Sequence, residues 1–325
     1  MYRISLRNNK SFECSEDDTL VEGARKAGIT LEHSCLSGRC SSCKVNVDIG
    51  FSEPTTLEIS LTEKEKNEGF ILSCVRKPKS DMAISAEDLS EYEISIPKTF
   101  PVKINNIEKL SDDTIKVELR LPPNQKFNFV PGQYINVIKG NIKRSYSIGN
   151  SISYPFLELY IKEYKGGLMS EFWFSDAKIN DLLRIEGPRG TFFLREKPTV
   201  QNIIFLATGT GIAPVKSILE TTFQKTIGFG NKKVYLFWGN RFSKDFFWDP
   251  REINKSINYF PVLSRDENSL VDRGYIQDVL ISKGLNLEQT IVYACGSDKM
   301  IQEAKQKLFK KGLPEENFFS DAFVI

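Results

Sequence analysis

The chain has 325 residues, 40% of them hydrophobic and 26% charged, and a net charge of +2. That length is enough for two or three domains with cores of their own, and the composition excludes fibrous and intrinsically disordered proteins. The small net charge argues against a dedicated nucleic-acid binder. No run approaches the roughly 18 apolar residues that cross a bilayer, and residues 1–7 alternate like a strand instead of resembling a signal peptide. We therefore expect a cytoplasmic protein that binds neither nucleic acid nor membrane.

The first hundred residues carry the signals of a small α+β domain followed by a linker. Apolar and polar residues alternate near the N-terminus, and residues 18–28 have the capping signals of a short helix that ends at a glycine. Residues 86–98 are polar and acidic and lie between two patterned regions. We assign residues 1–88 to the first domain and residues 89–98 to the linker.

The rest of the sequence changes its pattern once. From Pro101 to about Glu186, short β-patterned runs separated by turn signals predict a small antiparallel barrel. Beyond Asn202, buried strands alternate with helices, which predicts a doubly wound parallel sheet. We place the barrel in residues 99–198 and the sheet in residues 199–325. The chain is therefore expected to contain three domains, of the α+β, all-β and α/β classes.

Four of the six cysteines have the spacing of an iron-sulfur site. Cys35, Cys40 and Cys43 are spaced C-x4-C-x2-C, and Cys74 follows 31 positions later, as in the plant-type ferredoxins that hold a 2Fe-2S cluster. Zinc is the alternative, but zinc ligands usually form two C-x2-C pairs, and here only Cys40 and Cys43 form one. Cysteines of a cytoplasmic protein are reduced or bound to metal. We expect these four thiolates to bind the cluster, with His33 as a neighbour and not a ligand.

The motif Arg144-Ser145-Tyr146-Ser147 resembles the flavin-binding strand of the ferredoxin-NADP reductase superfamily. Arg144 can neutralise the pyrophosphate of FAD, and the amides that open a helix at residues 168–170 can bind the same anion. The resemblance implies that Tyr146 stacks on the isoalloxazine ring and that Ser147 hydrogen-bonds the ring nitrogen that receives the hydride. The alternative is that they are ordinary barrel residues. The expected flavin-binding residues are Arg144, Tyr146, Ser147, Gly167, Leu168, Met169 and Ser170.

Residues 205–214 run from a buried strand through a glycine loop into a helix, an arrangement that lets a dinucleotide pyrophosphate approach backbone amides. The loop reads G-x-G-x-x-P, a variant that matches the same superfamily. A later strand ends in Cys295-Gly296, at the carboxyl edge of the predicted sheet, where ligands bind. The expected nicotinamide-binding residues are Thr208, Gly209, Thr210, Gly211, Cys295 and Gly296.

Two further roles follow from the superfamily resemblance. It implies that Cys295 lies beside the nicotinamide ring, whereas the alternative is a buried structural thiol. It also implies that a C-terminal aromatic, here Phe323, covers the flavin face that the nicotinamide must reach. The alternative for Phe323 is a place in a last strand that closes the sheet. The expected catalytic residues are Ser147, Cys295 and Phe323.

Six short motifs follow one another in a specific order along nearly the whole chain: Glu32-His33-Ser34-Cys35, Leu119-Arg120-Leu121-Pro122-Pro123, Arg144-Ser145-Tyr146-Ser147-Ile148, Arg184-Ile185-Glu186-Gly187-Pro188, Ala213-Pro214-Val215-Lys216-Ser217 and Phe318-Phe319-Ser320-Asp321-Ala322-Phe323. In these motifs the sequence resembles the CDP-6-deoxy-Δ3,4-glucoseen reductases, which supply electrons in 3,6-dideoxyhexose biosynthesis. Two positions depart from the family pattern. Ser41 replaces a glycine of the cluster loop, and Ala207-Thr208 replaces the usual Ala-Gly, but neither change removes a ligand.

The resemblance implies a β-grasp ferredoxin domain, FAD, NADH and an electron-accepting partner. That partner would be an iron-sulfur, pyridoxamine-phosphate-dependent dehydrase acting on a CDP-linked 4-keto-6-deoxyhexose. Flavin is needed between the other two cofactors because nicotinamide gives two electrons as a hydride, whereas the cluster accepts one at a time. Reductases of ring-hydroxylating oxygenases and monooxygenases share the three modules and are the alternative. A non-enzymatic electron carrier would need only the first domain.

Overall fold

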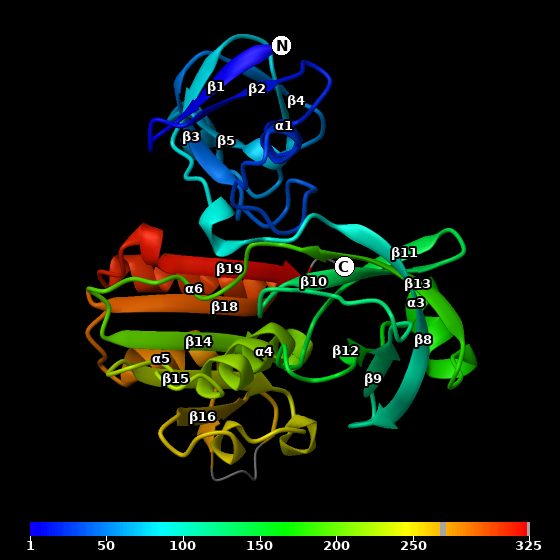
Figure 1. Ribbon diagram of the computed structural model, residues 1–325. Coiled ribbons are helices and arrows are strands. Elements are labelled where there is room, and N and C mark those ends of the chain that lie inside the picture. Colours follow the sequence, from blue (N-terminus) through cyan, green and yellow to red (C-terminus); the bar gives the residue numbers. More distant parts are fainter. Residues whose placement is uncertain (267–270, 324–325) are drawn as a thin grey trace. The chain divides into compact units, whose positions relative to one another are not determined.

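The computed structural model describes residues 1–266 and 271–323, within which the chain forms two compact units, Met1–Ser95 and Ile96–Phe323 (Figure 1). The boundary between the units falls inside residues 89–98, where the linker was expected. Residues 267–270 and 324–325 of the expected third domain lie outside the described residues.

The segment expected to be a linker has structure at both of its ends. Leu89 is buried, and its amide donates a hydrogen bond to the carbonyl of Thr30 at 2.8 Å. Asp88, just before it, forms an ion pair with Lys10 at 2.5 Å. Lys98, at the other end, is already the first residue of a barrel strand. The stretch between the two ordered ends is therefore short.

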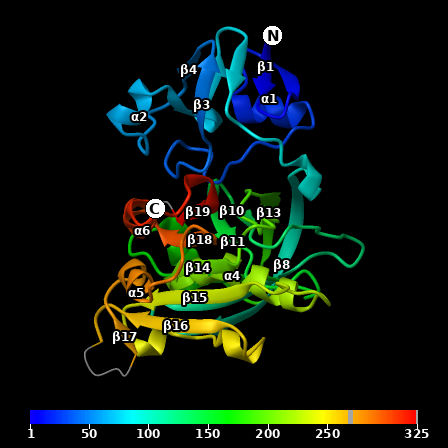
Figure 2. The same cartoon turned by 90° about the vertical axis from the view of Figure 1, so that its left-hand side faces the viewer.

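The first unit is a five-stranded sheet with one helix packed on it (Figure 2). Its main elements are β1 (Tyr2–Leu6), β2 (Ser11–Cys14), α1 (Leu20–Lys26), β3 (Lys44–Ile49), β5 (Phe70–Leu72) and β7 (Met82–Ile84). The strand order is β2-β1-β7-β3-β5, and only β1 and β7 are parallel. The remaining elements are β4 (Ser52–Pro54), β6 (Arg76–Pro78) and α2 (Glu63–Asn67). This is the expected β-grasp arrangement.

The expected capped helix is confirmed in detail. The Thr19 side chain accepts a hydrogen bond from the amide of Glu22, and the Glu22 carboxylate accepts one from the amide of Thr19. Gly28 has a φ of +77°, which a glycine adopts without steric cost, and it follows the last turn. Leu20 and Ala24, one turn apart, have no exposed surface and pack into the core of the unit.

The second unit begins with a six-stranded antiparallel sheet that closes into a barrel. Its strands are β8 (Lys98–Lys109), β9 (Thr114–Arg120), β10 (Tyr134–Lys139), β11 (Ile142–Ser147), β12 (Leu157–Lys162) and β13 (Leu182–Arg189). The order is β11-β10-β13-β8-β9-β12, and a single bridge between Ile148 and Leu159 joins the two edges. Gln133 ties two turns together, since its side chain donates to the carbonyl of Gly190 at 3.0 Å and accepts from the amide of Val130 at 2.8 Å. The predicted antiparallel barrel is confirmed.

The same unit continues into a six-stranded parallel sheet. Its elements are β14 (Asn202–Thr208), α4 (Ile212–Phe223), β15 (Lys233–Asn240), β16 (Asn258–Leu263), β17 (Asp272–Arg273), α5 (Ile276–Ser282), β18 (Thr290–Ser297), α6 (Asp298–Lys310) and β19 (Phe318–Phe323). The strand order is β17-β16-β15-β14-β18-β19, and Figure 1 shows β16, β15, β14, β18 and β19 side by side. All neighbouring pairs are parallel. The predicted doubly wound sheet is confirmed.

The strand order reverses between β14 and β18, because the chain adds β15 to β17 on one side of β14 and β18 and β19 on the other. Loops diverge at such a switch point and leave a crevice at the carboxyl ends of the strands. The glycine loop after β14 and the Cys295-Gly296 pair of β18 both lie there. No helix in residues 1–266 and 271–323 is both long and apolar enough to cross a membrane.

Candidate functional site

The four predicted cluster ligands lie in two pairs in the first unit. The sulfurs of Cys43 and Cys74 are 3.1 Å apart, and the amide of Cys35 donates to the sulfur of Cys40 at 3.5 Å. Hydrogen bonding within a pair lowers the pKa of one thiol, and that of Cys35 falls to about 5 through its bond with Cys40. In the other pair, the bond with Cys43 lowers the pKa of Cys74. The same bonds raise the pKa of the partner thiols Cys40 and Cys43, so within each pair one sulfur carries the negative charge and the other keeps the proton.

The paired arrangement fits the donor set of a 2Fe-2S cluster. Four thiolates hold such a cluster, two on each iron. No group of three or more His, Cys, Asp or Glu side chains in the described parts of the chain is arranged to hold a single metal ion. His33 faces the backbone, with its Nδ1 2.9 Å from the carbonyl oxygen of Leu31.

Backbone amides of the cysteine loop point at the sulfurs. The amide of Ser37 lies 3.4 Å from the Cys35 sulfur, and the amide of Gly38 hydrogen-bonds Cys74. Such donors stabilise negative charge on bound thiolates. Ser41 has a φ of +59°, a left-handed conformation that explains why a glycine is usual at this position. Its hydroxyl donates to the carbonyl of Ser60 at 3.3 Å, which helps to hold the conformation.

The predicted flavin-binding residues lie on β11 and on the helix that packs against it. Arg144 and Tyr146 are two positions apart on β11 and therefore share a face of the strand. The indole N–H of Trp173 donates to the Tyr146 hydroxyl at 3.1 Å, and the two rings meet edge to face. Burial raises the pKa of Tyr146 to about 12, so its hydroxyl stays protonated at neutral pH. The Tyr146 ring thus has a fixed orientation, and Arg144 is exposed.

The helix α3 (Leu168–Glu171) begins at Gly167 and contacts β11. Its first amides have no acceptor within the helix and can bind an anion. The side chains of the segment have other tasks, since Met169 is buried in the barrel core and the Ser170 hydroxyl accepts from the amide of Tyr164 at 2.7 Å. Leu168 is exposed. The Ser170 hydroxyl keeps its own proton to donate, so that hydroxyl and the backbone amides of this predicted group are available to a pyrophosphate.

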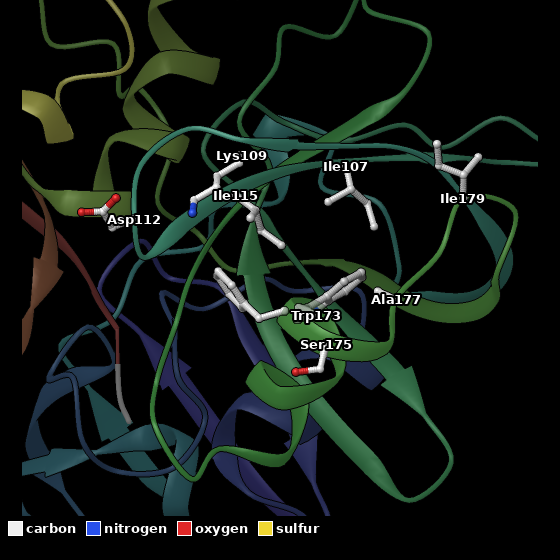
Figure 3. A pocket seen from close by; sticks show the side chains of 9 residues that line it. Ile107, Lys109, Asp112, Ile115, Trp173, Ser175, Ala177 and Ile179 are labelled. Carbon is white, nitrogen blue, oxygen red and sulfur yellow. The ribbon is translucent and has the colours of Figure 1, made fainter.

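A hollow of about 420 Å³ lies on the barrel beside this region (Figure 3). Its lining combines apolar side chains of β8, β9 and the segment after α3 with Ser175 and with Lys109 and Asp112 of the β8–β9 hairpin. None of the predicted cofactor-binding residues lines it. Trp173 does, and it also donates to Tyr146, so this indole separates the hollow from the predicted flavin-stacking ring.

The two nicotinamide motifs are in direct contact at the switch point of the parallel sheet. A Cβ atom on Gly211 would lie 2.5 Å from the carbonyl oxygen of Cys295, and one on Gly296 would lie 2.1 Å from the hydroxyl of Thr208. Both glycines are therefore required by close packing. Thr208, which departs from the family pattern, accepts a hydrogen bond from the amide of Ser297 at 3.4 Å. Gly209 has a φ of +54° and open space beside it, as a backbone that contacts a phosphate requires.

Cys295 pairs with Asp321 of β19 in the sheet register and has no exposed surface. Burial, assisted by the charge of Asp321, raises the pKa of the Cys295 thiol well above its usual value. The thiol is therefore neutral at physiological pH, which excludes a nucleophilic role for it in this state. Phe323, two residues beyond Asp321, ends β19 and is partly buried against the core that includes Cys295.

The structure adds an acidic residue to which the sequence motifs assigned no role. The Ser147 hydroxyl of the barrel lies 3.5 Å from the carboxylate of Asp321 on β19, and both side chains are buried. The fold thus brings Ser147, Cys295 and Asp321 together from three strands. The available signal was an acid inside a mostly apolar final strand, a position that acids rarely occupy without a partner.

A second residue absent from the predictions is Arg265. Its amide donates to the carbonyl of Arg241 at 3.1 Å, so two exposed arginines lie side by side beyond the carboxyl ends of β15 and β16. Lys244, the other cation of this loop, forms an ion pair with Asp112 of the barrel. Arg265 therefore adds a second arginine beside Arg241 at this edge of the sheet.

Three family models match successive parts of the chain: the 2Fe-2S iron-sulfur cluster binding domain at residues 5–79, the oxidoreductase FAD-binding domain at residues 101–194 and the oxidoreductase NAD-binding domain at residues 205–306. The fold and the site define an oxidoreductase that uses a nicotinamide dinucleotide and FAD and carries its own 2Fe-2S domain. A ferredoxin reductase in carbazole 1,9a-dioxygenase has a similar structure, with a TM-score of 0.70 and 25% identity over 99% of this chain and 98% of its own.

Two curated relatives extend the match over the full length. Protein RfbI of Salmonella typhimurium is 38% identical over 97% of this chain and 94% of its own. The CDP-6-deoxy-L-threo-D-glycero-4-hexulose-3-dehydrase reductase of Yersinia pestis is 36% identical over 96% of this chain and 95% of its own. The chain belongs to the family of iron-sulfur flavoprotein reductases that includes these two proteins.

Replacing Ser147 with Ala tests the hydroxyl at the centre of the site. We expect flavin to bind but its reduction by NADH to slow, because a hydrogen bond that strengthens in the transition state is lost. Stopped-flow measurement of flavin reduction gives the limiting rate. Ser145→Ala is the matched control, because the Ser145 hydroxyl bonds Asn136 instead. A Ser147→Ala rate within about threefold of the parent, roughly 0.7 kcal/mol, would contradict the assignment.

Proposed function

We propose that this protein uses NADH to supply electrons, through FAD and the 2Fe-2S cluster, to a CDP-6-deoxy-4-hexulose 3-dehydrase of 3,6-dideoxyhexose biosynthesis. One observation carries the choice of partner: the similarity to the named dehydrase reductase extends over 96% of this chain, with 36% identity. The partner would be an iron-sulfur, pyridoxamine-phosphate-dependent enzyme, and both proteins would act in the cytoplasm. The matched carbazole dioxygenase reductase keeps an oxygenase partner as the second candidate.

We also propose a division of labour along the chain. Residues 1–88 bind the cluster through Cys35, Cys40, Cys43 and Cys74, and residues 89–98 connect them to the rest. Residues 99–198 bind FAD, and residues 199–325 bind the nicotinamide. This proposal is supported by the places of the paired thiols, of β11 with α3, and of the glycine loop after β14.

The geometry supports a distinct task for each polar group near the flavin. When bound, FAD takes up a hydride and passes its electrons on singly, as the cluster requires. Arg144 and the first amides of α3 neutralise the pyrophosphate, while Tyr146, oriented by Trp173, supports a ring face. The Ser147 hydroxyl has one proton, which points to the Asp321 carboxylate in this structure and would turn to the ring nitrogen when FAD is bound.

The neutral Cys295 thiol offers the nicotinamide a polarisable contact without a charge. Because it is fully buried, a nicotinamide ring reaches it only when a neighbouring side chain moves. Phe323 lies on the adjacent strand and packs against the same core. We therefore assign to Phe323 the role of a gate that the nucleotide displaces.

Cys74→Ser tests the proposed electron path. We expect loss of the visible iron-sulfur spectrum and of electron delivery to the dehydrase, because one iron lacks a ligand. Reduction of a small dye by NADH should persist, since the flavin residues belong to the other unit. The control is Cys14→Ser, which changes a buried cysteine outside the cluster loop and should keep the spectrum. Complete loss of dye reduction in Cys74→Ser would contradict separable domains.

The partner itself is tested by NADH consumption with the intact protein. We expect the rate to rise when the dehydrase and its CDP-linked 4-keto-6-deoxyhexose are added together, and not when a ring-hydroxylating oxygenase is added with its substrate. The reverse result would assign the protein to the second candidate function.

NADH should be preferred over NADPH. The family resemblance favours NADH, and the Lys244 ammonium is engaged with Asp112. Arg241 and Arg265 oppose this expectation, because an arginine can bind the ribose phosphate of NADPH bidentately. The ratio of kcat/KM for NADH to that for NADPH measures this preference. A ratio that favours NADPH would overturn the assignment, and Arg265→Ala would then show which arginine is responsible.

Phe323→Ser tests the proposed gate. Removal of a side chain that competes for the flavin face should tighten nicotinamide binding and speed oxidation of the reduced protein by oxygen. The cluster spectrum should not change. Phe319→Leu, in the core side of the same strand, controls for a general loss of packing. Unchanged nucleotide affinity and oxygen reactivity with a lower Tm would identify Phe323 as a packing residue only.

A further inference from the structure

A row of polar groups on α4 holds the loop that directly follows the flavin-binding strand β11. Five consecutive loop residues bond four residues of the helix and its C-cap residue, Gln224, in the same order along the chain. The contacts are Lys216 Nζ to Gly149 O at 3.0 Å, Ser217 Oγ to Asn150 O at 2.7 Å, Ser151 N to Glu220 Oε2 at 3.1 Å, Ile152 N to Thr221 Oγ1 at 3.3 Å and Ser153 Oγ to Gln224 Oε1 at 2.9 Å. We call this set of contacts the α4 seam.

The seam is buried at its start and exposed at its end. Lys216 and Ser217 are 7% and 0% exposed, whereas the contact between Ser153 and Gln224 lies at the surface. The Lys216 ammonium also contacts the carboxylates of Glu158 at 2.9 Å and Glu220 at 2.8 Å. All three of its donors therefore have an acceptor inside the protein. A buried charge satisfied in this way has one position, because any displacement would leave it unpaired at a high cost.

Further contacts make the barrel side of the seam rigid. Glu158 lies on β12, where its carboxylate also accepts from the Tyr160 hydroxyl at 2.5 Å. The amide of Glu158 donates to the Asn150 side chain at 2.7 Å. The Tyr160 ring packs against Phe247, which belongs to the parallel-sheet part of the unit, with ring centres 4.8 Å apart. Lys216 thus connects α4 to a barrel segment that has little freedom to shift.

The two sides of the buried start of the seam, one on the barrel and one on α4, lead directly to the reacting groups. Gly149 is two residues after Ser147, whose hydroxyl we assign to the flavin ring nitrogen. Lys216 lies just beyond the first turn of α4, which starts after the Gly209–Gly211 loop and lies beside β14 in both views (Figures 1 and 2). The buried start of the seam therefore joins the flavin strand to the helix that carries the dinucleotide loop.

We propose that Lys216 and Ser217 are positioning residues for hydride transfer, which set the distance between the flavin strand and the dinucleotide loop. They act through the carbonyls of Gly149 and Asn150 and touch neither cofactor. The inference rests on the proposed roles of Ser147 and the glycine loop. Hydride transfer depends steeply on this distance, and a misplacement of about 1 Å can cost about a hundredfold in rate.

Lys216→Met and Ser217→Ala test the proposal in the full-length holoprotein. We expect the limiting rate of flavin reduction at saturating NADH to fall at least about tenfold in Lys216→Met. The flavin content, the cluster spectrum and the Kd of the nucleotide should stay close to those of the parent. Ser217→Ala, which removes one hydroxyl without creating a buried charge, should also lower the rate and remains informative where Lys216→Met fails to fold.

Gln224→Ala is the control at the far end of the seam, where the Gln224 side chain accepts from Ser153 Oγ at 2.9 Å and donates to Ser151 Oγ at 3.3 Å. We expect its flavin reduction rate to equal that of the parent. Hydrogen exchange in the cofactor-free protein gives a readout independent of activity. The amide of Ile152 donates to Thr221 within the seam, and it should exchange faster in Ser217→Ala than in Gln224→Ala.

Two outcomes would overturn the proposal. One is a limiting rate within about twofold of the parent in Ser217→Ala together with a lower Tm, since the contact would then contribute to stability only. The other is an equal loss of rate in Gln224→Ala, because the rate would then not depend specifically on the buried end of the seam. A parent protein whose flavin is not reduced by NADH would instead refute the proposed function, so the two failures are distinguishable.

Discussion

The ammonium group of Lys216 lies between the carboxylates of Glu158 and Glu220, where the flavin barrel meets the parallel sheet. A lone charge at this depth would be unstable, so helix and barrel must stay together to keep it paired. This constraint explains why residues 96–323 form one compact unit although their sequence patterns are those of two domains. A hydride can pass between cofactors bound to different domains only when the distance between those domains is fixed.

Two glycines, which pack closely because they lack side chains, give the nucleotide end of the site its shape. Gly211 and Gly296 allow the loop after β14 to touch the end of β18, and a Cβ on either residue would overlap backbone or a hydroxyl. The parallel sheet reverses its strand order at this same place. The glycine loop therefore places backbone amides at the carboxyl ends of the strands, while the arginines lie further out, beyond β15 and β16.

Burial gives chemically similar groups different properties in the two units. Burial raises the pKa of Cys295, whereas hydrogen bonds within the cysteine loop lower the pKa of Cys35 and Cys74 and raise that of their partners Cys40 and Cys43. Thiols that bind iron must lose their protons.

Features that depend on neighbours in the chain could be predicted from the sequence by itself. The spacing of Cys35, Cys40 and Cys43 indicated an iron-sulfur loop, the capping residues around Thr19 a helix, and the alternation of strands and helices a parallel sheet, and the family models and the fold agree with these predictions. Each signal lies within a few turns of backbone, where local geometry decides the outcome.

Only the tertiary structure decided which distant groups meet. Ser147 and Asp321 are 174 positions apart, and nothing near either residue indicates the other. The same holds for Arg241 beside Arg265, and for Lys216, which as part of a short motif was indistinguishable from an exposed helix lysine until its two carboxylates were located. Pairing of this kind depends on how strands from separate layers align. It is set by the packing of the whole unit, and no local pattern encodes it.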